Sequence, residues 1–368
     1  IEIPPRFAGK PPVNPEAQRS MLVSGEWNGA SGLADDVEYY GQRMKEEAFK
    51  RIGHLYPKVK VPTEQGGGEA NVIAWIWART VKCPNPACSC NMPLASSFVL
   101  SKKKGSEAYI QPIVEATNIR FEVKQGREAP NPTKNSRGAN FTCLCCGQTA
   151  TGEYIRTEAH AQRMGKVLMA IVAEGRNGKI YLSPNIEHEQ IANEATYEWK
   201  PEQLVTTPCH DVDRLPMYGM PTWGDVFTAR QLAALSTFSL LIDEIQQKAE
   251  KDAIAAGLPN DYTSLSENGM GAKAYGQAIG VYLACAIDQL SRYSCTICGW
   301  NVTNQNVAQA FGRQALPMVW DFAETNTLAG PLDFSTAVSW PVSALRKLPI
   351  AERIGKAVQY DAQSDCGM

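Results

Sequence analysis

The sequence predicts an α+β fold in which a β-rich domain is inserted in a mixed, largely helical region. Residues 72–184 contain short apolar and aromatic runs that are separated by turn residues. Residues 185–345 contain two long segments with apolar residues at helical spacing. At 368 residues, 44% of them hydrophobic, the chain can bury the cores of two or three domains.

Two groups of cysteines bracket much of the β-rich region. The first is Cys-Pro-Asn-Pro-Ala-Cys at residues 83–88, and the second is Cys-Leu-Cys-Cys-Gly at residues 143–147. The second has the usual knuckle spacing, whereas the first is longer than usual. Two tight turns with two thiols each provide the four soft ligands that a tetrahedral Zn²⁺ requires. We therefore predict a zinc ribbon. Its predicted ligands are Cys83, Cys88, Cys143 and Cys146.

The remaining cysteines leave alternatives open. Cys90 and Cys145 lie in the same segment, and either can replace a neighbour as ligand. The thiols can also be reduced core residues without a metal. A disulfide framework is less favoured, because the count of 11 cysteines is odd and no secretory segment is evident, which indicates a cytoplasmic protein. Cys295 and Cys298 form a further pair, but one pair cannot close a tetrahedral site, so we expect them to pack in the core.

Charge is unevenly distributed along the chain. The net charge of −2 does not indicate a nucleic-acid partner, yet residues 99–142 carry eight basic and four acidic side chains, a local charge of +4. This insert between the cysteine groups is a candidate for phosphate contact. The alternative is an ordinary solvated surface. The candidate nucleic-acid-binding residues are Lys102, Lys103, Lys104, Arg120 and Lys124.

The elements expected in the first half follow from periodicity. Residues 1–71 form a Pro-rich linker and a helix over 32–55, which ends before Pro57. Residues 72–81 are an apolar run typical of a buried strand that leads into the first cysteine group. Further strands are expected at residues 108–115, 119–124, 167–172 and 179–182, the last two around an Arg-Asn-Gly turn.

The second half is expected to be mainly helical. We predict a polar helix near 187–198, a long helix capped by Thr228 and a second long helix rich in small residues around 275–290. Residues 346–368 are expected to form a returning strand, centred on 357–361. The aromatic and charged segment 311–324 is a candidate pocket wall, although core packing explains it equally well. The candidate pocket residues are Arg313, Trp320 and Asp321.

Several segments give the chain a family resemblance. They lie at residues 3–12, 51–57, 72–88, 100–105, 224–232 and 311–324, and include Lys-Cys-Pro-Asn-Pro-Ala-Cys and Leu-Ser-Lys-Lys-Lys-Gly. On these segments the chain resembles the zinc-ribbon-containing adenine-specific DNA methylases of prokaryotes, proteins often found near restriction-modification and phage-defence genes. The resemblance implies that this chain is the central region of such a methylase, between the S-adenosylmethionine motif and the Asp-Pro-Pro-Tyr motif. It also implies that the chain lies at the edge of a Rossmann-like methylase domain.

The catalytic motifs of such methylases are missing from this sequence. We find no glycine-rich turn after a first strand and no Asn/Asp/Ser-Pro-Pro-aromatic motif, so we predict no catalytic residue. The resemblance therefore implies a fragment that is inactive alone, needs the remainder of the methylase core to bind S-adenosylmethionine, and contributes zinc and duplex-DNA recognition. Two alternatives are a free-standing zinc-ribbon module that binds nucleic acid or protein, and a purely structural scaffold.

Overall fold

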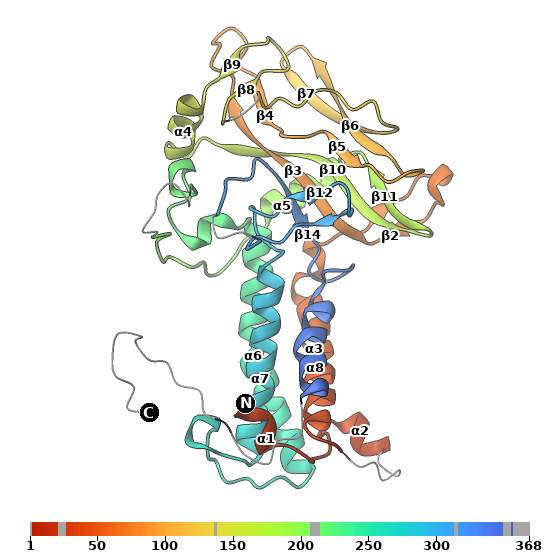
Figure 1. The fold of residues 1–368 in the computed structure, drawn as a ribbon, viewed down its shortest axis with the longest axis vertical. Helices are drawn as coiled ribbons and strands as arrows, with labels where there is room; N and C mark the ends of the chain where they lie inside the picture. Colours follow the sequence, from red (N-terminus) through yellow and green to blue (C-terminus); the bar gives the residue numbers. More distant parts are fainter. Residues whose placement is uncertain are drawn as a thin grey trace. The chain divides into compact units, whose positions relative to one another are not determined.

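The computed structural model describes residues 2–20, 27–135, 138–206, 214–312, 316–348 and 355 (Figure 1). The chain divides into two compact units, each built from segments that are distant in sequence. Unit 1 comprises Ile1–Ala48, Phe238–Asp288 and Phe334–Met368, and unit 2 comprises Phe49–Thr237 and Gln289–Asp333. The domain boundaries expected from the sequence remain a prediction, and the strand expected at 357–361 lies outside the described residues.

Unit 1 is helical. Its helices, three of which extend past the unit's boundaries, are α1 (Ile3–Arg6), α2 (Pro15–Ser20), α3 (Ser31–Ile52), α6 (Ala229–Ala255), α7 (Ala272–Ser291) and α8 (Phe334–Lys347). The expected helix over 32–55 and the two long later helices are confirmed. Small residues in α7 permit close packing, because a Cβ at Gly276 would lie 2.5 Å from the Gln246 carbonyl oxygen of α6.

A buried carboxylate ties the N-terminal segment of unit 1 to its helices. Asp36 is fully buried and accepts hydrogen bonds from the backbone amides of Val13 (2.7 Å) and Asn14 (2.9 Å). It also accepts from the Asn14 side chain (2.8 Å) and the Tyr275 hydroxyl (2.6 Å). Burial raises the pKa of Asp36, while these four donors oppose that shift.

Unit 2 is organised around one central strand, β3 (Val72–Lys82), as the apolar run predicts. The sheet is antiparallel with the order β11-β10-β3-β14 (Figure 1). β14 pairs with residues 74–78 of β3, and β4 pairs with the residues that follow, 79–82. The partner strands are β4 (Asn91–Leu94), β10 (Gly165–Gly175), β11 (Gly178–Leu182) and β14 (Asp321–Thr325). The strands expected at 167–172 and 179–182 are thus confirmed as one hairpin.

Both faces of β3 are covered, which explains its nearly continuous apolar sequence. On one face the Trp75 indole donates to His188 of α5 (Ile186–Glu194) at 3.0 Å, and Trp77 stacks on Phe322 of β14 with 6.5 Å between the ring centroids. On the other face Ile76 and Ala78 belong to the core that includes the cysteine groups. A strand covered on both faces favours apolar side chains at nearly every position.

A second sheet and several short elements complete unit 2. The three-stranded sheet comprises β5 (Val99–Ser101), β6 (Ala108–Glu115) and β7 (Asn118–Gln125), which confirms both strands expected there. The two-stranded ladders are β1 (Val59–Lys60) with β2 (Glu69–Ala70), β8 (Phe141–Thr142) with β9 (Thr149–Ala150), and β12 (Trp300–Asn301) with β13 (Asn306–Val307). The short helices are α4 (Gly152–His160) and α5 (Ile186–Glu194).

Helix boundaries follow local capping. The backbone amide of Gln231 donates to the Thr228 hydroxyl at 3.1 Å, so Thr228 caps α6 as expected. The polar helix expected near 187–198 exists, but it ends at Glu194 because Ala195 is extended, with ψ of 135°.

Every described strand pair is antiparallel, which confirms the α+β class, while a Rossmann-like edge remains a prediction.

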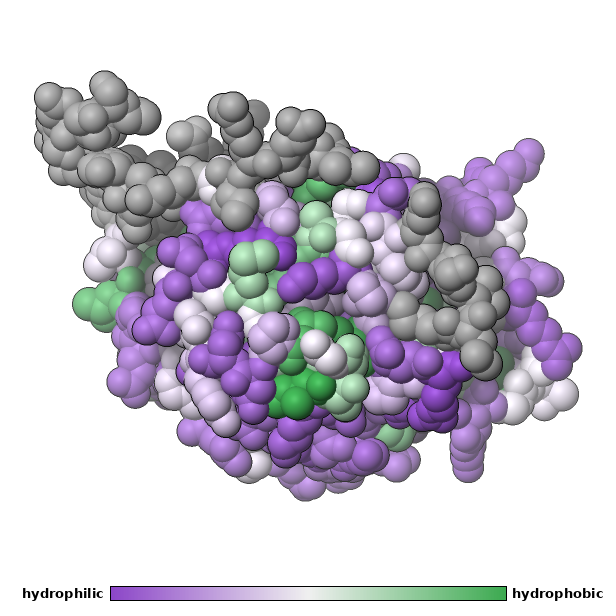
Figure 2. Space-filling view, turned by 90° about the horizontal axis from the view of Figure 1, so that it is seen from below, coloured by the Kyte–Doolittle hydropathy of each residue, from purple (hydrophilic) through white to green (hydrophobic). Residues whose placement is uncertain are grey.

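The surface is largely polar where Figure 2 displays it. On that face hydrophilic residues surround a small hydrophobic patch. The most exposed apolar side chains include Ile186 (75%) and Tyr262 (70%), which lie in different units. Single exposed apolar residues are normal on proteins. Within the described part of the chain, no helix combines the length and the apolar character needed to cross a bilayer.

Candidate metal centre

The first cysteine group forms the turn between β3 and β4. The Cys83 amide donates to the Cys90 carbonyl at 2.8 Å, which closes the hairpin. Inside it the Cys88 amide donates to the Asn85 carbonyl (3.0 Å), and the Asn85 side chain accepts from the Ala87 amide (3.0 Å). Asn, Pro and Ser favour such turns because their side chains or rings fix the backbone locally. The longer spacing of this group therefore still yields a closed knuckle.

The second cysteine group forms the turn between β8 and β9. The Cys143 amide donates to the Gln148 carbonyl at 2.8 Å, and the Gly147 amide donates to the Cys143 carbonyl at 2.9 Å. Gly147 has a φ of +75°, a conformation that favours glycine because it has no Cβ. The Cys-x-x-Cys-Gly pattern thus corresponds to a knuckle with its glycine at the left-handed position.

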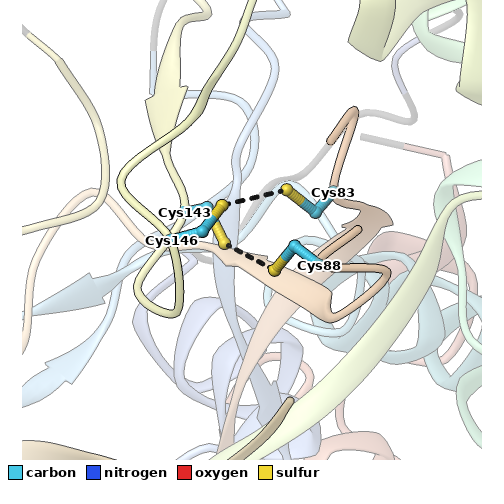
Figure 3. A group of neighbouring side chains, drawn as sticks. All are labelled: Cys83, Cys88, Cys143 and Cys146. Carbon is cyan, nitrogen blue, oxygen red and sulfur yellow. Dashed lines mark hydrogen bonds between the residues drawn. The ribbon is translucent and has the colours of Figure 1, made fainter. Parts of the chain in front are cut away.

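The two turns bring together the four predicted ligands, which project toward one another (Figure 3). Their sulfur atoms all lie within 4.8 Å of one another. The Sγ–Sγ distance is 3.6 Å for Cys83 and Cys146 and 3.9 Å for Cys88 and Cys143. A tetrahedral site with Zn–S bonds of about 2.3 Å has sulfur edges of about 3.8 Å. The donor set therefore fits a metal ion such as Zn²⁺.

Two further thiols lie in the same cluster. Cys90 and Cys145 form a second group of four with Cys88 and Cys143, again within 4.8 Å of one another. The Sγ atoms of Cys90 and Cys143 are 3.2 Å apart. Of the six cysteines only Cys146 is exposed and Cys145 is partly exposed. The structure therefore gathers six thiols, two more than a single tetrahedral ion needs.

Burial raises the pKa of three of the six thiols. It raises the pKa of Cys83 to about 12, although the Asn85 backbone amide opposes the shift. Burial also raises the pKa of Cys90 and of Cys145. Thiolates are the metal-binding form, so an incoming cation must displace these protons.

The other cysteine pair lies elsewhere in the core of unit 2. Cys295 and Cys298 are buried with their Sγ atoms 3.4 Å apart, and Cys298 also contacts the Arg292 carbonyl at 3.5 Å. Among the residues that the structure describes, neither belongs to a group of three or more potential metal ligands. The expected core packing of this pair agrees with their burial.

The five basic candidates differ in their surroundings. Lys102, Lys103 and Lys104 form the exposed turn between β5 and β6, and in the described part of the chain none of them has an ion-pair partner. Arg120 instead donates to Glu115 (2.8 Å) and to Glu122, which also lies 3.7 Å from Lys124. The three lysines retain uncompensated charge, whereas the other two cations are already paired.

Two further basic residues, outside the five candidates, lie beside the lysine turn. A cavity of about 460 Å³ is lined by Gly105 and Ser106 of this turn and by Arg176 and Lys179 of the β10–β11 hairpin. Burial lowers the pKa of Lys179, and the charge of Lys103 lowers it further. The Arg-Asn-Gly sequence by itself indicates only a hairpin turn, because it does not reveal which residues lie next to the turn in the fold.

The predicted pocket residues have different environments. Trp320 is buried, with edge-on ring contacts to Phe141 (5.1 Å) and Tyr218 (4.9 Å), as expected for core packing. Asp321 accepts a hydrogen bond from the Ser96 amide at 2.9 Å, and burial raises its pKa to about 6. Arg313 lies outside the described residues.

Comparisons with known proteins identify no family for the chain. No protein-family model, no curated protein and no solved structure matches it.

Proposed function

We propose that unit 2 is a zinc-ribbon domain that binds duplex DNA as part of an adenine-N6 DNA methyltransferase. The observation that carries the proposal is the convergence of four cysteines from two hairpin turns, at separations suited to a tetrahedral ion. The chain would supply metal binding and DNA contact. S-adenosylmethionine and the Asp-Pro-Pro-Tyr motif would belong to the remainder of the methylase core.

The place of the cysteines in the chain supports a structural role for zinc. The β3–β4 and β8–β9 turns lie at the two ends of residues 91–142, which include the three-stranded sheet and its lysine turn. A bound ion would therefore fix both ends of the basic insert. Structural zinc sites contribute on the order of 10 kcal/mol or more to the folding of small domains.

The local order of the lysine turn supports phosphate contact. The Ser101 hydroxyl accepts from the Lys103 amide (3.2 Å), and the Ser106 amide donates to the Lys103 carbonyl (2.9 Å). The backbone is thus held while the three ammonium groups face solvent. Unpaired cations on an ordered turn can bind phosphates without first giving up an intramolecular partner.

Binding of the full chain to duplex DNA at several salt concentrations tests this proposal. Replacing Lys102, Lys103 and Lys104 by Gln should weaken binding and reduce the slope of log K against log salt by up to about 2.7, because each lost phosphate contact removes about 0.9. The matched control replaces Arg120 and Lys124 by Gln. Since Glu115 and Glu122 already neutralise these two cations, the control should have a much smaller effect.

Two results would contradict the DNA part of the proposal: no salt-dependent binding by the wild-type chain, or an unchanged slope in the triple variant.

The methylase part has a separate test. The chain would be combined with a polypeptide that carries the glycine-rich and Asp-Pro-Pro-Tyr motifs, and N6-methyladenine formation would be measured with and without it. Methylation that does not depend on the chain would contradict a role in the methyltransferase.

A further inference from the structure

We propose that the six clustered cysteines hold two metal ions rather than one, bridged by the thiolates of Cys88 and Cys143. The observation is that the two groups of four potential ligands share these two residues. Such a binuclear centre deepens the zinc-ribbon part of the proposed function and rests on it. It also gives a role to both thiols that a single ion would leave over.

Each ion would have two bridging and two terminal ligands. Cys83 and Cys146 would complete the first ion, and their sulfur atoms are 3.6 Å apart. Cys90 and Cys145 would complete the second. The two sets of four share the edge between Cys88 and Cys143, whose sulfur atoms are 3.9 Å apart.

The charge balance favours the second ion. One Zn²⁺ with four thiolates has a net charge of −2 and leaves two neutral thiols. Two Zn²⁺ with six thiolates also have a net charge of −2, so the second ion adds no buried charge. Its binding converts two S–H bonds into metal–sulfur bonds and releases two protons to solvent. No oxidant or reductant is needed.

The location of the two additional thiols supports ligation. Cys90 is only 2% exposed, and its sulfur lies 3.2 Å from that of Cys143. Cys145 lies on the β8–β9 turn, and its sulfur is within 4.8 Å of the sulfur atoms of Cys88, Cys90 and Cys143. One thiol from each turn is the arrangement that also supplies the first ion, so the two sets of terminal ligands are built alike.

The test measures how many metal ions the intact, reduced chain binds. The chain is saturated with Zn²⁺, and the excess is removed before the metal is measured. We expect two ions per chain in the wild type. The double variant Cys90→Ser with Cys145→Ser should retain one, and so should Cys83→Ser with Cys146→Ser. The control Cys285→Ser changes an exposed cysteine outside the cluster and should retain two. Because a variant can fail to fold, the wild type would also be loaded with ¹¹³Cd²⁺, for which two NMR resonances are expected.

The outcomes separate this inference from the proposed function. One ion per wild-type chain and a single cadmium resonance would overturn the binuclear centre and leave an ordinary zinc ribbon. No bound ion would overturn both the ribbon and the binuclear centre. Two ions without salt-dependent DNA binding would support the binuclear centre and contradict the DNA-binding role.

Discussion

Removing the charge of Glu324 should destabilise unit 2 strongly. This carboxylate on β14 forms two bonds with the Arg230 guanidinium of α6, at 3.1 Å and 2.8 Å, and both side chains are at most 1% exposed. It also accepts from the Thr228 hydroxyl at 2.7 Å. The guanidinium lies 3.9 Å from the ring centroid of Trp75. Glu324→Gln would keep one acceptor and leave a buried cation without its counter-charge.

The magnitude follows from this geometry. Removing one partner of a buried ion pair costs about 3–5 kcal/mol. We expect the lower end, about 3 kcal/mol, because Gln can still accept from Thr228 and from one guanidinium nitrogen. Replacing both partners by apolar residues, as in Arg230→Met with Glu324→Leu, should recover most of the loss, since apolar packing often equals a buried pair in stability.

Urea unfolding of the full chain, followed by tryptophan fluorescence, measures these losses. Burial alone would raise the pKa of Glu324, but the Arg230 charge and the hydrogen bonds hold it below its ordinary value. The pair's contribution is therefore present above about pH 4 and is lost as the pH falls further. A loss below about 1 kcal/mol at pH 7, or a double variant as unstable as the single one, would refute this reasoning.

Substitutions at three other places test separate parts of the molecule. Asp321→Asn should stabilise the fold above pH 6 by up to about 3 kcal/mol, because burial raises the pKa of this carboxyl to about 6. The gain should vanish below about pH 4, and a pH-independent difference in urea unfolding would contradict it. Asp36→Asn should cost about 1–3 kcal/mol, because its amide NH₂ would face donors and leave them without an acceptor. Tyr275→Phe removes a single donor and should cost about 1 kcal/mol. Equal losses on thermal unfolding would argue against the four-donor arrangement. Gly147→Val should weaken Zn²⁺ binding by about tenfold, because a φ of +75° costs a β-branched residue on the order of 1–2 kcal/mol. Competition with a chelator measures the affinity. An unchanged affinity would show that the knuckle does not need this conformation.

Local patterns allowed several of the longer elements to be predicted. The apolar run at 72–81 and the helical spacing in α3 and α6 identify elements whose periodicity matches their burial. The cysteine spacing likewise identified both turns, because a knuckle is a local structure with its own residue preferences. These successes share one cause, since each depends on interactions within a few residues.

Long-range pairing could not be predicted in the same way. Arg230 looks like an ordinary cation at the start of a helix, and its partner Glu324 follows 94 residues later. The pairing of Arg120 with Glu122 was accessible in principle, because residues two apart on a strand share a face. The bond from Arg120 to Glu115 depends on the register between β6 and β7, which sets Arg120 opposite Ile113. Counting charges in the sequence therefore overestimates the number of cations that are free to bind phosphate.

The candidate metal centre and the aromatic segment are separate in the sequence but share one part of the core. The β8–β9 ladder has only two residue pairs, too few to stabilise a hairpin in water. Interactions outside the ladder hold it in place. The Thr142 amide donates to the Thr133 carbonyl at 2.7 Å, Phe141 of β8 packs edge-on against Trp320, and the residues after Thr142 contribute thiols to the cluster. Trp320 in turn accepts a backbone hydrogen bond from Arg79 of β3 at 2.9 Å. The aromatic core would thus fix one end of the hairpin and the bound metal the other, so the cysteines complete an element that its own backbone pairing cannot sustain.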